Sequence, residues 1–202
     1  MALYISICLN SNGIRQIISM GIYNSEDEMD WNNFFFKLQE MGLSGVELII
    51  SDGHKGIMKA VEESFPGSLW QYCHFHFLKN LRKTMNKEQW KRITRIVSEA
   101  LMDESLFTIA VTRMEEMKLE KSVDMFYRWY DPLYSYTSFP EQHYRKIHTN
   151  NITGRFNKEL KRRTRKIGAF PNNDSLMRLV VSIAININDE WLLRKYINME
   201  VD

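Results

Sequence analysis

The pattern of hydrophobic and polar positions changes along the chain. Residues that favour β-strands are concentrated in two runs, residues 3–9 and residues 15–23. Residues 10–13 between them have the sequence Asn-Ser-Asn-Gly, and both Asn and Gly tolerate the positive φ angles of tight turns. The pattern therefore predicts an antiparallel β-hairpin at the start of the sequence.

Helical segments and short apolar runs follow the hairpin. Apolar residues recur with a helical period over residues 27–41, which predicts a helix. Residues 46–50 form a short apolar run that predicts a buried strand, and residues 69–73 form a second short run that is compatible with a strand. Residues 55–65 between these runs predict a second helix, because Pro66 ends the pattern.

The later part of the chain has a helical pattern only. No strand pattern remains from residue 77 to residue 136, and two further helices are predicted at residues 150–165 and 173–191. Residues 168–171 separate these two helices. Because strands alternate with helices only in the first part, the order predicts an α/β fold with an all-helical insertion.

Composition and charge exclude several classes of protein. Hydrophobic residues make up 44% of the chain, as in globular domains, and the net charge of +2 excludes a histone-like basic protein. The two cysteines cannot form a disulfide framework and fit a reducing compartment. No signal peptide is recognised, and the apolar run at residues 179–187 is shorter than the roughly 20 residues that span a membrane. We therefore expect a soluble cytoplasmic protein with no membrane partner.

One short segment concentrates positive charge. Residues 155–166 contain seven basic residues and one acidic residue, Glu159, so this segment carries +6 and the rest of the chain −4. Ile152, Phe156 and Leu160 recur every four residues and form an apolar stripe suited to docking on a core. Most charge runs are solvated helix faces, but this density favours nucleic-acid binding through phosphates. The predicted DNA-binding residues are Arg155, Lys158, Lys161, Arg162, Arg163, Arg165 and Lys166.

A carboxylate directly follows the strand predicted at residues 46–50. Asp52 lies in the sequence Ser-Asp-Gly-His-Lys-Gly, and ligands of α/β sheets gather at the carboxyl ends of strands. Its oxygens suit Mg²⁺, while Gly53 and Gly56 allow close approach of the backbone. Alternatively, Asp52 caps the following helix, since Asp is a preferred N-cap residue, and the two roles do not exclude each other.

A second group of candidate ligands, Cys73, His74 and His76, lies within a single short segment. A structural zinc site normally needs four ligands, and Cys8 is the only other cysteine, so a zinc finger is not expected. No Asn or Asp that would orient a Cys–His nucleophile can be assigned from the sequence. The commoner arrangement is a small buried cysteine with a hydrogen-bonded histidine nearby.

Several motifs occur together and in the order of one known family. They are IISDGHKGI at residues 49–57, FP at residues 65–66, WQYCHFHFLKN at residues 70–80, TNNITGRFNKELKRRTR at residues 149–165 and NDEW at residues 188–191. These motifs resemble the core of Mutator-type insertion-sequence transposases, and the resemblance covers nearly the whole chain.

The resemblance implies a fold and a chemistry. Members of the family have a core similar to ribonuclease H, with a helical insertion, and hold two Mg²⁺ ions through Asp, Asp and Glu for DNA cleavage and strand transfer. Asp52 corresponds to the second Asp, a metal ligand, while Cys73 and His76 match a C-x-x-H signature that supports the active site. The implied domains are the first part of the catalytic core (residues 1–76), the helical insertion (residues 77–148) and the C-terminal helices with the DNA-facing basic helix (residues 149–202).

The sequence also departs from the family pattern. The family's first Asp lies on a strand before the segment aligned with residues 3–9, so we expect that strand and its carboxylate to be absent. Gly154 occupies the position of the family's Glu, and Glu159 matches a different family position. One carboxylate cannot fix two Mg²⁺ ions, because Mg²⁺ demands near-ideal octahedral coordination.

These departures predict a truncated or degenerate transposase with impaired Mg²⁺ binding, DNA cleavage and strand transfer. The expected partner is DNA, both transposon ends and target, with association with the nucleoid when bound. Self-association into a homo-oligomer is left open. The alternatives are a non-catalytic DNA-binding or interaction fragment and a non-functional relic.

Overall fold

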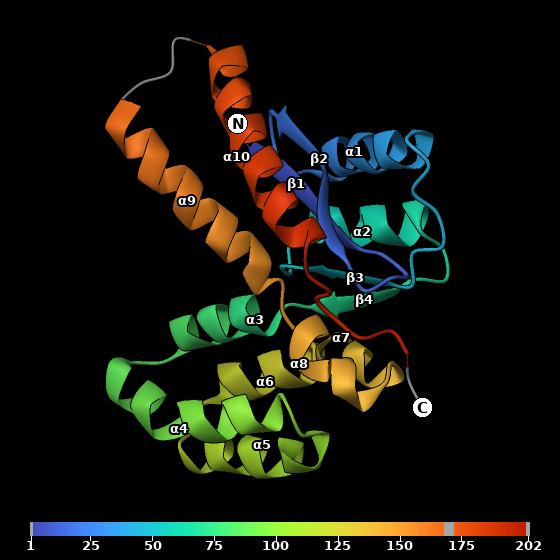
Figure 1. The fold of residues 1–202 in the computed structure, drawn as a ribbon. Coiled ribbons are helices and arrows are strands. Elements are labelled where there is room, and N and C mark those ends of the chain that lie inside the picture. Colours follow the sequence, from blue (N-terminus) through green and yellow to red (C-terminus); the bar gives the residue numbers. More distant parts are fainter. Residues whose placement is uncertain (1, 168–171, 201–202) are drawn as a thin grey trace. The chain divides into compact units, whose positions relative to one another are not determined.

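The computed structural model describes residues 2–167 and 172–200, leaving out the side chains of residues 151–153, 155, 164, 166 and 167. The chain divides into two units (Figure 1). The first unit comprises the residues up to Gly45, Lys55–Pro66 and the residues from Asn151 onward, and the second comprises Val46–His54 and Gly67–Asn150. Each unit contains one two-stranded sheet and its own helices.

The first unit is built on the predicted hairpin. β1 (Ala2–Leu9) pairs with β2 (Arg15–Tyr23) in antiparallel register, with an irregularity after Ser6. In the turn, the Oδ1 atom of Asn10 accepts hydrogen bonds from two backbone N–H groups, and Gly13 adopts a φ of 74°. The hairpin prediction and its turn residues are therefore confirmed.

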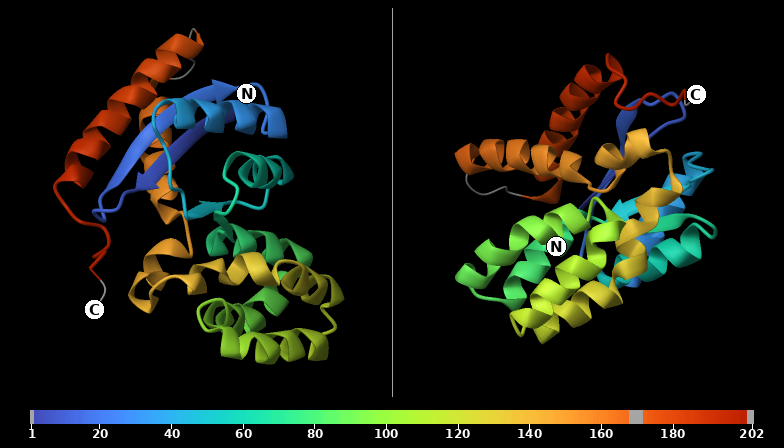
Figure 2. Two further views of the ribbon diagram at one scale, coloured as in Figure 1. Left: turned by 90° about the vertical axis from the view of Figure 1, so that its right-hand side faces the viewer. Right: turned by 90° about the horizontal axis from the view of Figure 1, so that it is seen from below.

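Helices cover both faces of this hairpin (Figure 2). On one face, Tyr4 stacks on Trp31 of α1 (Glu28–Glu40), with ring centroids 3.7 Å apart. On the other face, Ile17 of β2 lies in a hydrophobic core with α10 (Asn173–Leu192). A two-stranded hairpin alone buries too little apolar surface to be stable, so these two helix contacts supply the core of the unit.

The basic helix docks on the same face as α10. This helix, α9 (Asn151–Ile167), places Phe156 fully inside the core and Leu160 at its border. The apolar stripe predicted for this helix is confirmed at these two positions, whereas the side chain of Ile152 lies outside the described residues. The predicted connection at residues 168–171 also lies outside them. A further helix, α2 (Lys55–Ser64), packs against α1.

One side chain of α10 hydrogen-bonds to backbone groups of β2 that β1 does not use. Asn188 Oδ1 accepts from the N–H group of Ile17 at 2.8 Å, and Asn188 Nδ2 donates to the carbonyl of Ile17 at 3.0 Å. Beside it, the guanidinium of Arg15 lies 4.2 Å from the centroid of the Trp191 ring. Asn188 thus takes the hydrogen-bonding place that a neighbouring strand would occupy.

The second unit contains the two short strands predicted from apolar runs. β3 (Leu48–Ser51) pairs with β4 (Leu69–Tyr72) in parallel register, with Leu48 opposite Leu69 and Ser51 opposite Tyr72. β3 begins two residues later than its apolar run, because its partner strand begins only at Leu69.

The rest of the second unit is helical, as the sequence pattern predicts. Its helices are α3 (His74–Leu81), α4 (Lys87–Ala100), α5 (Phe107–Glu116), α6 (Glu120–Arg128), α7 (Tyr130–Tyr134) and α8 (Tyr144–Ile147). Its core contains aromatic rings from different helices: Phe126 lies 4.7 Å from Phe107 and 5.4 Å from Phe77, measured between ring centroids. Both centroid separations lie within the range of favourable aromatic pairs, about 4.5–7 Å.

The fold is therefore a mixed α/β one, mostly helical with two small sheets among the described residues, and the predicted fold class is confirmed at that level. Among the described helices, none is both long and apolar enough to cross a lipid bilayer.

Candidate functional site

Parallel pairing of β3 and β4 brings two of the sequence motifs to one sheet edge. The carboxyl ends of both strands lie at this edge, followed by Asp52 after β3 and Cys73 after β4. The backbone N–H group of Cys73 donates to the carbonyl of Ser51 at 2.8 Å, which extends the ladder to the site itself. Asp52 and the C-x-x-H motif, about 20 positions apart in sequence, therefore adjoin within the second unit.

Asp52 is exposed at the start of the turn that follows β3. Its Oδ1 atom accepts a hydrogen bond of 3.3 Å from the N–H group of His54, within the turn that precedes α2. Gly53 lies against the ring of Tyr72, where an added Cβ atom would be 2.7 Å from the Tyr72 Cζ atom. Only glycine fits here without displacing the ring, so the turn is held close to β4.

Tyr72 links Asp52 to α3. The Tyr72 hydroxyl accepts a hydrogen bond of 2.9 Å from Asn80 Nδ2. Burial raises the pKa of Tyr72, the hydrogen bond from Asn80 opposes this, and the negative charge of Asp52 raises the pKa further. The carboxylate of Asp52 therefore lies close enough to act on the phenol. Sequence reasoning missed both Tyr72 and Asn80, although they flank the C-x-x-H motif.

Cys73 is fully buried and holds a distant segment of the unit. Its Sγ atom donates to Asn150 Oδ1 at 3.0 Å and lies 3.3 Å from Thr149 Oγ1. Burial acts to raise the pKa of the thiol, but the nearby polar groups of His76, Thr149 and Asn150 outweigh this effect, and the pKa is lowered. Cys73 is thus the small buried cysteine that the sequence predicts, and its contacts also act as a clamp that holds Thr149 and Asn150, the residues immediately before α9.

His76 lies half-buried on the first turn of α3. Interaction with Cys73 raises the pKa of His76, as do the charges of Cys73 and Asp52, although burial and the charge of Lys79 oppose them. The His76 Nδ1 atom is buried and has no hydrogen-bond partner within the described part of the chain. The charge of Asp52 and the thiol of Cys73 therefore both act on His76 at this edge.

The donor set around Asp52 does not fit a two-metal centre. Among residues 2–167 and 172–200, no three His, Cys, Asp or Glu side chains lie close enough together to hold a metal ion. Asp52 supplies one hard oxygen ligand, whereas Mg²⁺ sites need near-ideal octahedral coordination. Asp52 belongs to the second unit, and Gly154, exposed in α9, belongs to the first.

Four basic residues of α9 lie on the side of the helix away from the docked Phe156. Lys158, Lys161, Arg162 and Arg165 are exposed, and Arg163 is half-buried. The side chains of Arg155 and Lys166 lie outside the described residues. Docking through Phe156 thus leaves the described basic side chains available to solvent.

Glu159 neutralises part of this basic surface. Its carboxylate accepts two hydrogen bonds from Arg162, at 2.7 and 2.8 Å, and a third from Arg163 at 2.8 Å. The Arg162 and Arg163 guanidiniums lower the pKa of Glu159 to about 2, so the carboxylate is ionised at neutral pH. Two of the predicted DNA-binding arginines are therefore already occupied by a carboxylate.

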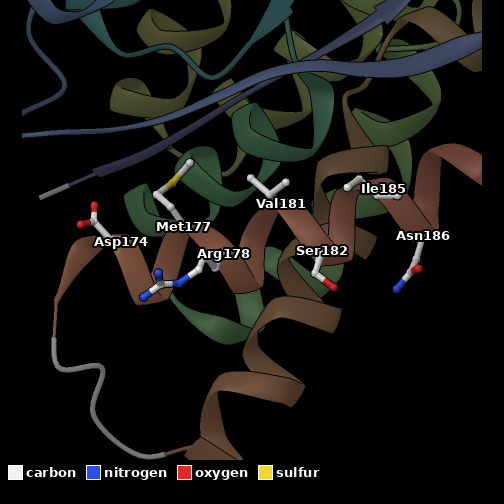
Figure 3. A pocket seen from close by; sticks show the side chains of 7 residues that line it. All are labelled: Asp174, Met177, Arg178, Val181, Ser182, Ile185 and Asn186. Atoms are coloured by element: carbon white, nitrogen blue, oxygen red, sulfur yellow. The ribbon is translucent and has the colours of Figure 1, made fainter.

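A shallow hollow lies along one face of α10 (Figure 3). Its walls include the apolar side chains Met177, Val181 and Ile185, and the last is 55% exposed. None of the predicted site residues lines it, and its lining holds one carboxylate and no His or Cys. The side chains that line this hollow therefore add no cluster of catalytic or metal-ligating groups to the candidate site.

Comparisons with known proteins agree with the motifs. A family model described as "Transposase, Mutator family" matches residues 1–193. The transposase of insertion sequence element IS256 in transposon Tn4001 from Staphylococcus aureus is 34% identical over 206 residues, covering 98% of this chain and 53% of that protein. The transposase of IS1081 from Mycobacterium tuberculosis is 32% identical, covering 96% of this chain and 48% of that protein. The chain thus spans about half the length of the curated relatives it matches.

Proposed function

The chain belongs to the Mutator family of transposases, and on this premise we propose that it forms part of a transposase core that binds DNA but has impaired cleavage chemistry. The proposal includes a ribonuclease-H-like arrangement of the strands, with residues 77–148 as the helical insertion and residues 1–76 and 149–202 as the core. The observation that carries it is the meeting of Asp52 with Cys73 and His76 at one sheet edge.

In this proposal each residue of the edge has a distinct part. Asp52 is the exposed carboxylate and would be one ligand of a catalytic Mg²⁺ ion, which polarises phosphate oxygens when bound. Cys73 supports the site by holding Thr149 and Asn150, and His76 completes the C-x-x-H pair. The basic face of α9 binds DNA through phosphates, without reading sequence.

Impaired cleavage follows from the site's own residues. Glycine offers no oxygen ligand, so Gly154 cannot replace the Glu that the family places there. Glu159 is engaged by Arg162 and Arg163, which argues against its serving as a substitute ligand. The residues of this chain therefore supply a DNA surface and one metal-facing carboxylate, but not a complete metal centre.

We expect the purified 202-residue chain to leave DNA uncut. A supercoiled plasmid carrying the ends of its insertion sequence, incubated with Mg²⁺ or Mn²⁺, should remain supercoiled on a gel. Asp52→Ala should give the same result, because one carboxylate alone does not support the reaction. Metal-dependent cleavage that Asp52→Ala abolishes would contradict the proposed impairment.

DNA binding through α9 is tested by reversing charges that have no acidic partner in the described part of the chain. The variant Lys158→Glu/Arg165→Glu should lower the affinity for duplex DNA at least about tenfold and flatten its salt dependence, since two phosphate contacts are lost. The variant Lys121→Glu/Arg128→Glu on exposed positions of α6 changes the net charge equally and should bind as the unmodified chain does. Fluorescence anisotropy with a labelled duplex measures both.

The opposite change should strengthen binding. Glu159→Gln releases Arg162 and Arg163 and should raise the affinity up to about tenfold at low salt, because roughly one further phosphate contact becomes available. If neither this variant nor the double charge reversal alters the affinity, α9 is not the DNA-binding surface.

A further inference from the structure

Positive charge is concentrated in a second segment, far from α9 in sequence. Residues 79–95 contain seven basic residues and one acidic residue, Glu88, so this segment also carries +6. The whole chain carries +2, so outside residues 79–95 and 155–166 it carries −10. An excess of positive over negative charge is thus concentrated in two segments, and the proposed role of α9 does not explain the one in the second unit.

Exposed aromatic and basic side chains follow one another along this segment, on α3, on the 3₁₀ turn after it and on the first residue of α4. Phe75, 54% exposed, lies one helical turn before Lys79, so both side chains project from the same side of α3. Arg82 and Lys83 follow in the 3₁₀ turn that continues α3, and Lys87 is the first residue of α4. We call these five residues the basic–aromatic stripe.

The charges of the stripe are not neutralised locally. Beyond the stripe, Lys91 pairs with Glu88 at 3.1 Å and Arg95 pairs with Glu99 at 2.8 Å. Within the described part of the chain, the four basic side chains of the stripe form no ion pair with a carboxylate. The stripe therefore presents its full positive charge to solvent, in contrast to α9, where a glutamate occupies two arginines.

A series of contacts links the stripe to the residue after Asp52. Lys83 Nζ donates to Asn80 Oδ1 at 2.9 Å, and Asn80 Nδ2 donates to the Tyr72 hydroxyl at 2.9 Å. The ring of Tyr72 in turn lies against Gly53, the residue after Asp52. These contacts all lie within the second unit, and an anionic chain bound along the stripe would lie next to the Asp52 carboxylate.

We infer that the basic–aromatic stripe binds single-stranded nucleic acid, with phosphates on its lysine and arginine side chains and a base stacked on Phe75. Bases in a duplex are already stacked on their neighbours, so an exposed phenyl ring offers its face to an unpaired base. An anionic membrane surface would need a broader apolar face than one phenylalanine provides. The inference rests on the proposed function and deepens it, since it assigns the form of nucleic acid held beside Asp52.

The two contributions of the stripe are tested separately. Anisotropy with a labelled single strand of about 30 nucleotides should show at least about a tenfold loss of affinity in Lys79→Glu/Arg82→Glu, with a flatter salt dependence. Phe75→Ala should lower the single-strand affinity about fivefold or more, leave the salt dependence unchanged and affect duplex binding less. The control is Lys121→Glu/Arg128→Glu, which has the same net charge as the stripe variant and should bind single strands normally.

Other outcomes overturn the inference and separate it from the proposed function. If Lys158→Glu/Arg165→Glu weakens DNA binding while the stripe variants bind single strands normally, the α9 proposal stands and the stripe has no such role. If Phe75→Ala weakens duplex and single-strand binding equally, the assignment to single strands is wrong. If the stripe variants lose only binding to phosphatidylglycerol vesicles, the partner is a lipid surface and the inference fails.

Discussion

Replacing Phe156 by alanine is expected to lower the free energy of unfolding by about 3–5 kcal/mol. Phe156 is fully buried in the core that joins α9 to β2 and α10, where it packs with Ile17, Val180 and Ile183. Truncating the ring removes its transfer free energy and leaves a cavity that neighbouring side chains fill only in part. The loss is a large share of the stability of a domain of this size.

A matched variant makes this result specific. Phe36→Ala removes the same ring from α1 in the same unit, but Phe36 is 59% exposed, so its free energy of unfolding should change by only about 0.5 kcal/mol. Urea titration followed by circular dichroism measures both variants. Equal losses in the two variants would show that α9 does not dock through Phe156. Phe156→Leu, which keeps most of the apolar volume, should fall between the two.

Acid should destabilise the protein through one buried histidine. His74 Nε2 lies 2.8 Å from the carbonyl of Leu133, which can only accept, so Nε2 carries the proton and Nδ1 is unprotonated. Nδ1 is buried without a partner in the described chain, and protonating it would bury an uncompensated charge. Burial above all, with the nearby His148, lowers the pKa of His74 to about 4, although the bond to Leu133 opposes this.

The sign of the effect follows from this lowered pKa. The unfolded chain binds a proton at His74 near pH 6.5, whereas the folded chain binds it only near pH 4. The contribution of His74 is therefore complete above pH 6.5 and lost as the pH falls towards 4, an effect of about 3 kcal/mol. His74→Gln keeps a neutral donor without a titratable group, so its stability should fall less steeply over this range.

Chemical denaturation at a series of pH values between 6.5 and 4 measures the difference. Exposed carboxylates titrate in both proteins and cancel in the comparison. Curves that remain parallel from pH 6.5 to 4 would show that His74 takes up its proton equally in the folded and unfolded chains.

Local patterns in the sequence were sufficient for elements that local interactions determine. The hairpin follows from residues 10–13 and the β-rich runs beside them, and both were placed within a residue of their observed bounds. β3 was placed less well, because its start depends on where β4 begins to pair. Such boundaries are set by a distant partner and leave no mark on the strand itself.

The candidate site was predicted only in part, again because some of its contacts join segments that are far apart in the sequence. Asp52, Cys73 and His76 could be singled out from residue type and spacing, since the parallel strands that carry them end at one edge. The clamp of Cys73 on Thr149 and Asn150 crosses more than 70 positions of the chain, and only tertiary structure brings these atoms together. The sequence motifs contained both segments but not the bond between them.

The neutralisation of Arg162 and Arg163 by Glu159 on α9 could be predicted from the sequence. Glu159 precedes Arg162 by three positions and Arg163 by four, the spacings at which side chains on a helix meet. Counting charges gave +6 for the segment, whereas the arrangement of those charges decides which of them remain available to a ligand. Spacing, rather than number, is therefore the informative property of such a run.

The two hydrogen bonds between Asn188 and Ile17 determine which edge of the first unit's sheet a further strand can join. The carboxamide occupies the backbone groups of β2 in the middle of that strand, so an additional strand cannot pair continuously along β2. β1 has eight residues with neither a charge nor a proline, two of the devices by which natural edge strands resist pairing. Any polypeptide that extends this sheet, whether from the same chain or another, must therefore add to β1.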